Sequence, residues 1–197
     1  MSWIEIAGFA TGGLSVWLYV RQNVWAWPVG IANCACWLTL FWTSRLYLDA
    51  GLQLIYLALG VAGWYWWLRG GDRRGRLPVT RAGRRETLVL TGIGLVGTLG
   101  LWWAMAAVSD AAPLPDAATT TVSLIAQYML TRKLLGNWWC WVAVDVAYTI
   151  MYATQHLYLT AALQPLFIVM CLVGLRDWRA ELRRPAESAA TALAVAR

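Results

Sequence analysis

Residues 51–86 read GLQLIYLALGVAGWYWWLRGGDRRGRLPVTRAGRRE, and this stretch indicates the fold class because an apolar segment is followed directly by a strongly basic one. Gly51–Leu68 carries no charged side chain and is close to the length that a helix needs to cross a bilayer. Seven arginines follow within Arg69–Glu86, which is typical of a loop on the cytoplasmic side of a membrane. The stretch therefore predicts a transmembrane helix followed by a cytoplasmic loop.

The composition of the whole chain also predicts membrane insertion. Of its 197 residues, 60% are hydrophobic and 13% are charged, whereas a soluble domain carries about 25% charged residues. A soluble fold of this size would expose much of that apolar surface to water. The composition thus excludes a soluble domain, a disordered chain and a nucleic-acid binder, despite a net charge of +6. The 15 tryptophans are typical of a membrane–water boundary or of a stacking site.

Apolar segments along the chain predict an all-α, polytopic protein with seven transmembrane helices, since each segment approaches the roughly 20 residues of a span. A basic loop, Arg69–Glu86, and a short acidic loop with Asp110, Pro113, Pro115 and Asp116 separate some of them. No basic region or small-residue cleavage site precedes the first span, so we expect no cleaved signal peptide. The seven spans are Trp3–Tyr19, Val24–Trp42, Gly51–Leu68, Leu88–Val108, Thr120–Leu135, Trp138–Ala153 and Tyr158–Leu175.

The distribution of basic residues tests this number of spans. The loops after the first, third, fifth and seventh spans lie on one side of the membrane, and they hold 15 of the 16 basic residues, leaving only Arg45 on the other side. Because positive charge stays in the cytoplasm, we expect a multi-pass protein of the inner or plasma membrane with its N-terminus outside and its C-terminus inside. This topological role accounts for the arginines without a dedicated ligand site. The alanine-rich tail after Pro185 is expected to be disordered or loosely helical.

An internal repeat divides the chain into two halves of the same orientation. Asn23-Val-Trp25-Ala-Trp27 matches Asn137-Trp-Trp139-Cys-Trp141 at an offset of 114 residues. Further matches have an offset of 111, and we expect the change of three residues to fall in an outer loop, where length varies freely. They pair Leu46-Tyr47 with Leu157-Tyr158, Leu52-Gln53 with Leu163-Gln164, Tyr56 with Phe167, Gly63 with Gly174, and Trp67 with Trp178.

Matching segments four spans apart predict a 3+1+3 parallel repeat, in which one linker helix restores the direction of the chain. Parallel repeats with a site at their interface are a known plan for transporters. The expected organisation is a first three-helix bundle (1–68), a basic cytoplasmic loop (69–87), a linker transmembrane helix (88–108), a second three-helix bundle (119–178) and a cytoplasmic tail (179–197).

Polar groups at membrane depth indicate a ligand site. Asp145 lies in the middle of the sixth span, where a carboxylate costs about 2.5–3.5 kcal/mol to insert. Helical spacing places it on one face with Trp138, Trp141, Tyr148 and Tyr152. The third span has a comparable stripe of Gln53, Tyr56, Gly60, Gly63, Trp64 and Trp67.

Helix packing or an interfacial aromatic belt would produce similar stripes, and this is the simpler interpretation for any single aromatic residue. Asp145 together with Trp141 instead favours a ligand site, because an acid, aromatic rings and amides converge there. Such a lining suits a flat, polar and cationic heterocycle, as found among vitamins, rather than an inorganic ion or a lipid.

Other classes of function fit the sequence less well. An enzyme would need a nucleophile–base pair or a metal cluster, but the sole histidine, His156, lies at an outer loop with no acid beside it. The four cysteines, Cys34, Cys36, Cys140 and Cys171, lack the spacing of a metal or redox site and are expected to be small core residues. A retinal protein would need a lysine in its last span, whereas the one lysine ends the fifth. We therefore expect no enzyme, metal or cofactor, and a small-molecule receptor stays an alternative to a transporter.

Several motifs together resemble the PnuC family of vitamin transporters over about residues 3–180. The segments that carry the resemblance are Asn23-Val-Trp-Ala-Trp-Pro-Val-Gly-Ile31, Leu46-Tyr-Leu-Asp49 with Leu52-Gln-Leu-Ile-Tyr56, Gly63-Trp-Tyr-Trp66, and Asn137-Trp-Trp-Cys-Trp141 with Asp145. The resemblance implies a fold like a full-length SWEET transporter, a homotrimer, and facilitated diffusion of nicotinamide riboside, a precursor of NAD. It also implies trapping of the substrate by a cytoplasmic kinase. Relatives carry thiamine or riboflavin, and these substrates stay open for this chain.

On this interpretation the substrate site lies between the two bundles. Trp37 and Trp141 would stack on the pyridinium ring, and Gln53, Gln127 and Asn137 would bond amide and ribose groups. Asp145 would accept ribose hydroxyl bonds or offset the positive charge of the ring. The full set of predicted substrate-binding residues is Trp37, Gln53, Tyr56, Gln127, Asn137, Trp138, Trp141, Asp145, Tyr148 and Tyr152.

Overall fold

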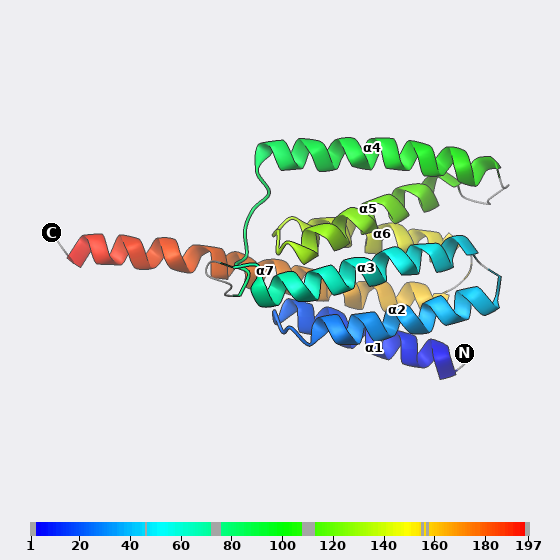
Figure 1. Ribbon diagram of the computed structural model, residues 1–197, viewed down its shortest axis with the longest axis horizontal. Helices are drawn as coiled ribbons and strands as arrows, with labels where there is room; N and C mark the ends of the chain where they lie inside the picture. Colours follow the sequence, from blue (N-terminus) through cyan, green and yellow to red (C-terminus); the bar gives the residue numbers. More distant parts are fainter. Residues whose placement is uncertain are drawn as a thin grey trace.

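The computed structural model describes residues 3–45, 47–71, 76–107, 113–154, 156 and 158–195. Within these ranges the chain forms seven α-helices, which confirms the all-α class and the number of helices. The odd-numbered helices run in one direction and the even-numbered helices run in the other (Figure 1). The helices are α1 (Trp3–Val20), α2 (Ala26–Thr43), α3 (Tyr47–Arg69), α4 (Arg84–Ala107), α5 (Pro113–Thr131), α6 (Asn137–Thr154) and α7 (Tyr158–Val195).

Many apolar side chains are exposed on the outside of the helix bundle, whereas several polar side chains are buried inside it, as expected for a protein surrounded by lipid. Helix α4 has no buried residue, and Val96 and Trp103 on it are 73% and 77% exposed. By contrast, hydroxyl side chains of α5 such as Thr119, Thr121 and Ser123 are buried. By length and hydropathy alone, Arg84–Ala107 and Thr160–Arg183 each suffice to cross a bilayer. The chain is a membrane protein.

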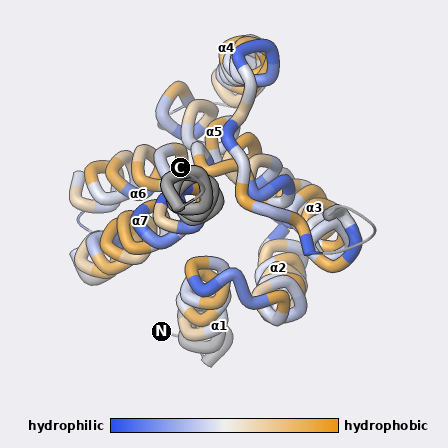
Figure 2. The backbone as a smooth tube through the Cα atoms, turned by 90° about the vertical axis from the view of Figure 1, so that its left-hand side faces the viewer, coloured by the Kyte–Doolittle hydropathy of each residue, from blue (hydrophilic) through white to orange (hydrophobic). Residues whose placement is uncertain are grey.

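The helices form two groups of three with α4 beside them. α2 packs against α1 and α3, and α6 packs against α5 and α7. The groups meet where α3 packs on α5 and where α7 packs on α1, while α4 packs on α5 at the side of the molecule (Figure 2). This is the parallel 3+1+3 arrangement, because α1–α3 and α5–α7 run in the same directions (Figure 1).

The register of the repeat is uniform, which corrects the expected offset of 114 around α2 and α6. Gln22 and Lys133 end the first helix of each bundle with φ of 52° and 51°, and Arg45 and His156 follow the second with 62° and 61°. Both pairs are 111 residues apart. The tryptophan-rich motifs matched in the wrong register because their neighbouring tryptophans offer several near-identical alignments. Leu46 and Leu157, which belong to the predicted matches, lie outside the described residues.

A close aromatic–glycine contact recurs in each bundle at this register. The ring of Trp27 in α2 covers Gly63 in α3, and the ring of Trp138 in α6 covers Gly174 in α7. A Cβ atom built on Gly174 would lie 2.6 Å from Cζ2 of Trp138, so only a residue without a side chain leaves room for the ring. The counterpart of Trp27 is therefore Trp138 and not Trp141.

One segment differs from the sequence prediction at a helix end. Pro113, Pro115 and Asp116 were expected in an acidic loop, but they form the first turn of α5. Proline suits this position because the first helical amides lack intrahelical partners, and the carboxylate of Asp116 complements the positive end of the helix. Asp110 lies outside the described residues. The alanine-rich tail continues α7 as one helix through Val195, which agrees with the helical one of its two expected states.

The basic segment between α3 and α4 is anchored to the second bundle. The amide of Thr80 donates to the carbonyl of Lys133 at 3.1 Å, and the amide of Leu135 donates back to Thr80 at 2.8 Å. Val79 is buried beside them. The segment thus ties the end of α3 to the turn between α5 and α6. Its Arg73 and Arg74 lie outside the described residues.

Candidate functional site

A cavity of about 520 Å³ lies between the two bundles. Side chains from α1, α2, α3, α5, α6 and α7 line it, while α4 contributes none of the lining residues. Nine of the ten predicted substrate-binding residues line this single cavity. They are Trp37, Gln53, Tyr56, Gln127, Trp138, Trp141, Asp145, Tyr148 and Tyr152.

Asn137 is placed differently from the prediction. It is the first residue of α6 and is fully buried. Its side-chain Nδ2 donates to the carbonyl of Leu134 at 2.7 Å, so the amide turns back into the α5–α6 turn. Asn137 is not among the residues that line the cavity. Its sequence position beside the tryptophans suggested a ligand contact, whereas its structural role is to organise the start of the helix.

Two stacked aromatic pairs line the cavity at equivalent places in the repeat. The rings of Trp37 and Phe41 in α2 are 5.6 Å apart with an interplanar angle of 27°. The rings of Tyr148 and Tyr152 in α6 are also 5.6 Å apart, with an angle of 15°. Each pair presents aromatic surface to the cavity, and Trp141 adds a further ring from α6. Flat aromatic faces of this kind can stack on a heterocycle or on a cationic ring.

The carboxyl group in the cavity is that of Asp145. The thiol of Cys171 in α7 donates to its Oδ2 at a sulfur–oxygen distance of 3.7 Å. Among the described residues no basic side chain forms an ion pair with Asp145. In the repeat its counterpart is Cys34, so the acid has no equivalent in the first bundle. The cavity therefore carries an acid on one side only.

Amide and hydroxyl groups complete the polar lining. Gln53 in α3 and Gln164 in α7 are repeat counterparts, and both line the cavity together with Gln127. The hydroxyl groups of Tyr56 and Ser123 lie 2.5 Å apart and connect α3 to α5 across the bundle interface. These groups can donate and accept hydrogen bonds to amides and hydroxyls of a ligand.

Sequence reasoning missed two of the amides. Gln164 could have been found, because the repeat already paired it with Gln53, which was predicted to bind substrate. Asn33 had no such signal. Its Nδ2 donates to the carbonyl of Gly8 at 2.7 Å and to Oγ1 of Thr11 at 2.8 Å, which fixes the side chain between α1 and α2. Three residues of the third-span stripe, Gln53, Tyr56 and Gly60, line the cavity. The other three, Gly63, Trp64 and Trp67, do not.

An aromatic layer closes the cavity at the end where α1, α3 and α5 finish. Its rings pack edge to face, with centroids 4.9 Å apart for Tyr19 and Trp27, and 5.2 Å apart for Trp138 and Trp178. Trp67 joins them, and all five side chains are at most 7% exposed. At the other end of the cavity, Phe41, Tyr152 and Thr160 are only partly buried. Packed side chains thus fill the space between the cavity and the end that carries the basic loops.

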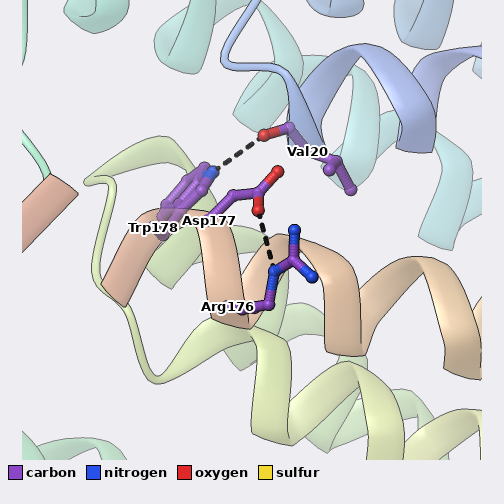
Figure 3. Close-up of polar contacts among 4 residues, drawn as sticks. All are labelled: Val20, Arg176, Asp177 and Trp178. Carbon is purple, nitrogen blue, oxygen red and sulfur yellow. Dashed lines mark hydrogen bonds and ion pairs between the residues drawn. The ribbon is translucent and has the colours of Figure 1, made fainter. Parts of the chain in front are cut away.

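Hydrogen bonds join the two bundles through this layer in a nearly symmetrical way. Nε1 of Trp67 in α3 donates to the carbonyl of Leu130 in α5 at 3.1 Å. Nε1 of Trp178 in α7 donates to the carbonyl of Val20 in α1 at 3.3 Å (Figure 3). In each case the third helix of one bundle binds the last turn of the first helix of the other bundle.

A buried lysine covers the layer on its outer side. Lys133, in the turn after α5, is 5% exposed, and its Nζ lies 4.5 Å from the centre of the Trp67 ring. Nζ donates to Oε1 of Gln22 at 2.9 Å, and Nε2 of Gln22 donates to the carboxylate of Glu181. Burial lowers the pKa of Lys133 to about 8, although the Glu181 carboxylate acts in the opposite direction. The chain Lys133–Gln22–Glu181 links both bundles.

The chain is similar to transporters over nearly its whole length. A family model described as nicotinamide mononucleotide transporter matches residues 2–180. The riboflavin/roseoflavin transporter RibM of Streptomyces davaonensis is 28% identical, with coverage of 92% of this chain and 87% of that protein. The nicotinamide riboside transporter PnuC of Escherichia coli is 26% identical, with coverage of 90% and 85%.

A solved structure shares the fold. The crystal structure of the vitamin B3 transporter PnuC aligns with a TM-score of 0.72 at 19% identity, and the alignment covers 93% of this chain and 83% of that one. Relatives and structural neighbour alike are transporters and not enzymes. The chain, which the family model matches across both bundles, belongs to the nicotinamide mononucleotide transporter family, the PnuC family of membrane vitamin transporters.

Proposed function

We propose that this protein carries nicotinamide riboside across the membrane by facilitated diffusion and binds it in the cavity between the two bundles. The observation that carries the proposal is the Asp145 carboxyl group, which lines an aromatic cavity and has no basic partner among the described residues. Nicotinamide riboside is a pyridinium cation, so a carboxylate beside its ring would offset the charge that enters the membrane. Riboflavin has no such charge.

The rest of the lining fits the remaining parts of this substrate. Trp37 and Trp141 offer faces for the pyridinium ring, and a cation over an aromatic face gains roughly 0.5–2 kcal/mol. Gln53, Gln127 and Gln164 offer donors and acceptors for the carboxamide and the ribose hydroxyls. Thiamine is also cationic, but it has no ribose and no carboxamide for these amides to bind.

Transport requires the closed end of the cavity to open. The substrate would enter beside Phe41 and Tyr152, and the Trp67 and Trp178 hydrogen bonds between the bundles would have to break for release. Because these bonds connect α3 to α5 and α7 to α1, a rocking of one bundle against the other would part them together. Parallel repeats move in this way around a fixed site.

The charges and the family resemblance support a proposal for the placement of the protein in the cell. The basic segments at the ends of α1, α3, α5 and α7 support a cytoplasmic location of that end in the inner or plasma membrane, with the N-terminus outside. The closed end of the cavity would then face the cytoplasm. We further propose a homotrimer with a SWEET-like fold, in which phosphorylation by a cytoplasmic kinase traps the substrate for NAD synthesis, so that transport needs no coupling ion.

Riboflavin is the second candidate substrate, because RibM, which is named as a riboflavin transporter, covers the chain as fully as PnuC does. Equilibrium binding to the purified protein, followed by tryptophan fluorescence, decides between the two. We expect nicotinamide riboside to bind at least about fivefold more tightly than riboflavin or thiamine, from the cation–π and hydrogen-bond contributions together. Tighter binding of riboflavin than of nicotinamide riboside would contradict the proposal.

A further inference from the structure

A second cavity lies on the outer face of α6 and α7, away from the substrate cavity. Its volume is about 650 Å³, and three of its lining side chains are arginines of α7. Arg176, Arg179 and Arg183 are spaced so that they share one face of the helix. The remaining lining residues are Trp139, Leu172, Leu175 and Ala180.

The cavity lies where the apolar part of α7 gives way to its charged part. Leu172 and Val169, one and two helical turns before Arg176, are 44% and 56% exposed on the surface of α7. Within Thr160–Arg183, the segment of α7 that by length and hydropathy could cross a bilayer, residues 160–175 carry no charge and Arg176 is the first charged residue. The arginines therefore lie at the level of the lipid headgroups, directly beyond a surface that faces the acyl chains.

The neighbouring start of α6 contributes an aromatic ring to the cavity. Trp139 is the third residue of α6 and is 52% exposed. The guanidinium of Arg179 lies 5.5 Å from the centre of its ring, which holds the charge over the cavity. Of the negative groups close by, Asp177 contacts Nε of Arg176 at 3.4 Å (Figure 3).

We propose that this cavity binds the phosphate of an anionic phospholipid, with the lipid's acyl chains lying along Leu172 and Val169. The three arginines provide the charge, and the exposed apolar surface provides a place for the chains. A soluble phosphate would contact only the arginines and not the apolar surface, so the arrangement favours a lipid. Basic cavities between helices on the cytoplasmic side of membranes recognise such headgroups. The arginines of α7 thus do more than set topology.

The test uses the full-length protein in detergent, titrated with short-chain phosphatidylglycerol, with phosphatidylcholine of the same chain length, and with inorganic phosphate. The readout is the unfolding temperature, because a ligand that binds the folded state raises it. We expect phosphatidylglycerol to raise the unfolding temperature at concentrations where the other two have no effect.

Variants locate the site. Arg179→Gln/Arg183→Gln should weaken phosphatidylglycerol binding by about fivefold for each arginine removed. Arg176→Gln/Arg183→Gln keeps the Arg179–Trp139 contact and serves if the first variant does not fold. Arg84→Gln/Arg85→Gln is the control, because these exposed arginines begin α4 at the same end of the molecule and lie outside the cavity. Equal effects of the two phospholipids, saturation by inorganic phosphate, or equal loss in the control would each overturn the proposal.

Discussion

Replacing Asp145 by asparagine is expected to lower the affinity for nicotinamide riboside more than the affinity for a neutral vitamin such as riboflavin. Asparagine keeps the hydrogen-bonding capacity and removes the charge, so the difference isolates the electrostatic role of the carboxylate. Trp141→Ala is expected to weaken the binding of nicotinamide riboside by roughly five- to thirtyfold, since a stacked ring contributes about 1–2 kcal/mol. Uptake into cells that depend on the vitamin, normalised to the amount of protein in the membrane, measures both effects.

Matched controls are available on surfaces away from the cavity. Ile150→Ala changes a 60% exposed residue of the same helix as Asp145, and Trp103→Ala removes a 77% exposed ring from α4. Neither should change uptake. If Asp145→Asn affects both vitamins equally and mildly, the carboxylate binds hydroxyl groups instead of the charged ring. If Asp145→Ala leaves binding intact and lowers only stability, its contact with Cys171 is structural and the substrate binds elsewhere.

Replacing Gly63 by alanine is expected to destabilise the protein severely. A Cβ atom there would collide with the indole of Trp27, which is buried and held by Tyr19 and Trp67 at centroid distances of 4.9 and 5.4 Å. Because the ring cannot move into this packed layer, we expect a loss of about 1–3 kcal/mol from overpacking. The measurement is the thermal unfolding of the purified protein, together with its level in the membrane.

Two further variants separate the collision from the change in helix propensity. Gly51→Ala in the same helix meets no atom within 4 Å, so it should be neutral or slightly stabilising. Gly63→Ala/Trp27→Leu removes part of the obstructing ring and should recover stability relative to Gly63→Ala alone. Equal stability of the Gly63→Ala and Gly51→Ala proteins would show that the contact between α2 and α3 is looser than the structure indicates.

The fold was largely predictable because membrane insertion imposes strong rules on the sequence. The lengths of the apolar segments located the seven helices of the described residues. The loops that carry the arginines were predicted to lie at one end of the bundle, because they follow the odd-numbered spans. Helix ends were less accurate because prolines that suggested a loop, Pro113 and Pro115, begin α5. The repeat was found, but its register around α2 was wrong, because only the contact of Trp27 with Gly63 shows which tryptophan faces the neighbouring helix.

The site was predictable to the extent that polar residues at membrane depth converge. Asp145 and the aromatic face of α6 line the cavity as their helical spacing suggested. Asn137 looked similar in sequence but serves the α5–α6 turn. The role of Lys133 was not visible in the sequence, because it depends on Gln22 and Trp67, which lie far from it along the chain and meet it only when the two bundles pack together.

The central claim is that this chain is a facilitator for nicotinamide riboside, and transport into protein-containing liposomes tests it most directly. Labelled nicotinamide riboside, riboflavin and thiamine are offered separately, with and without an imposed proton gradient. We expect nicotinamide riboside to enter fastest and to stop at equal concentrations inside and outside, regardless of the gradient. Faster entry of riboflavin, or accumulation of nicotinamide riboside above the outside concentration only when the proton gradient is present, would contradict this account.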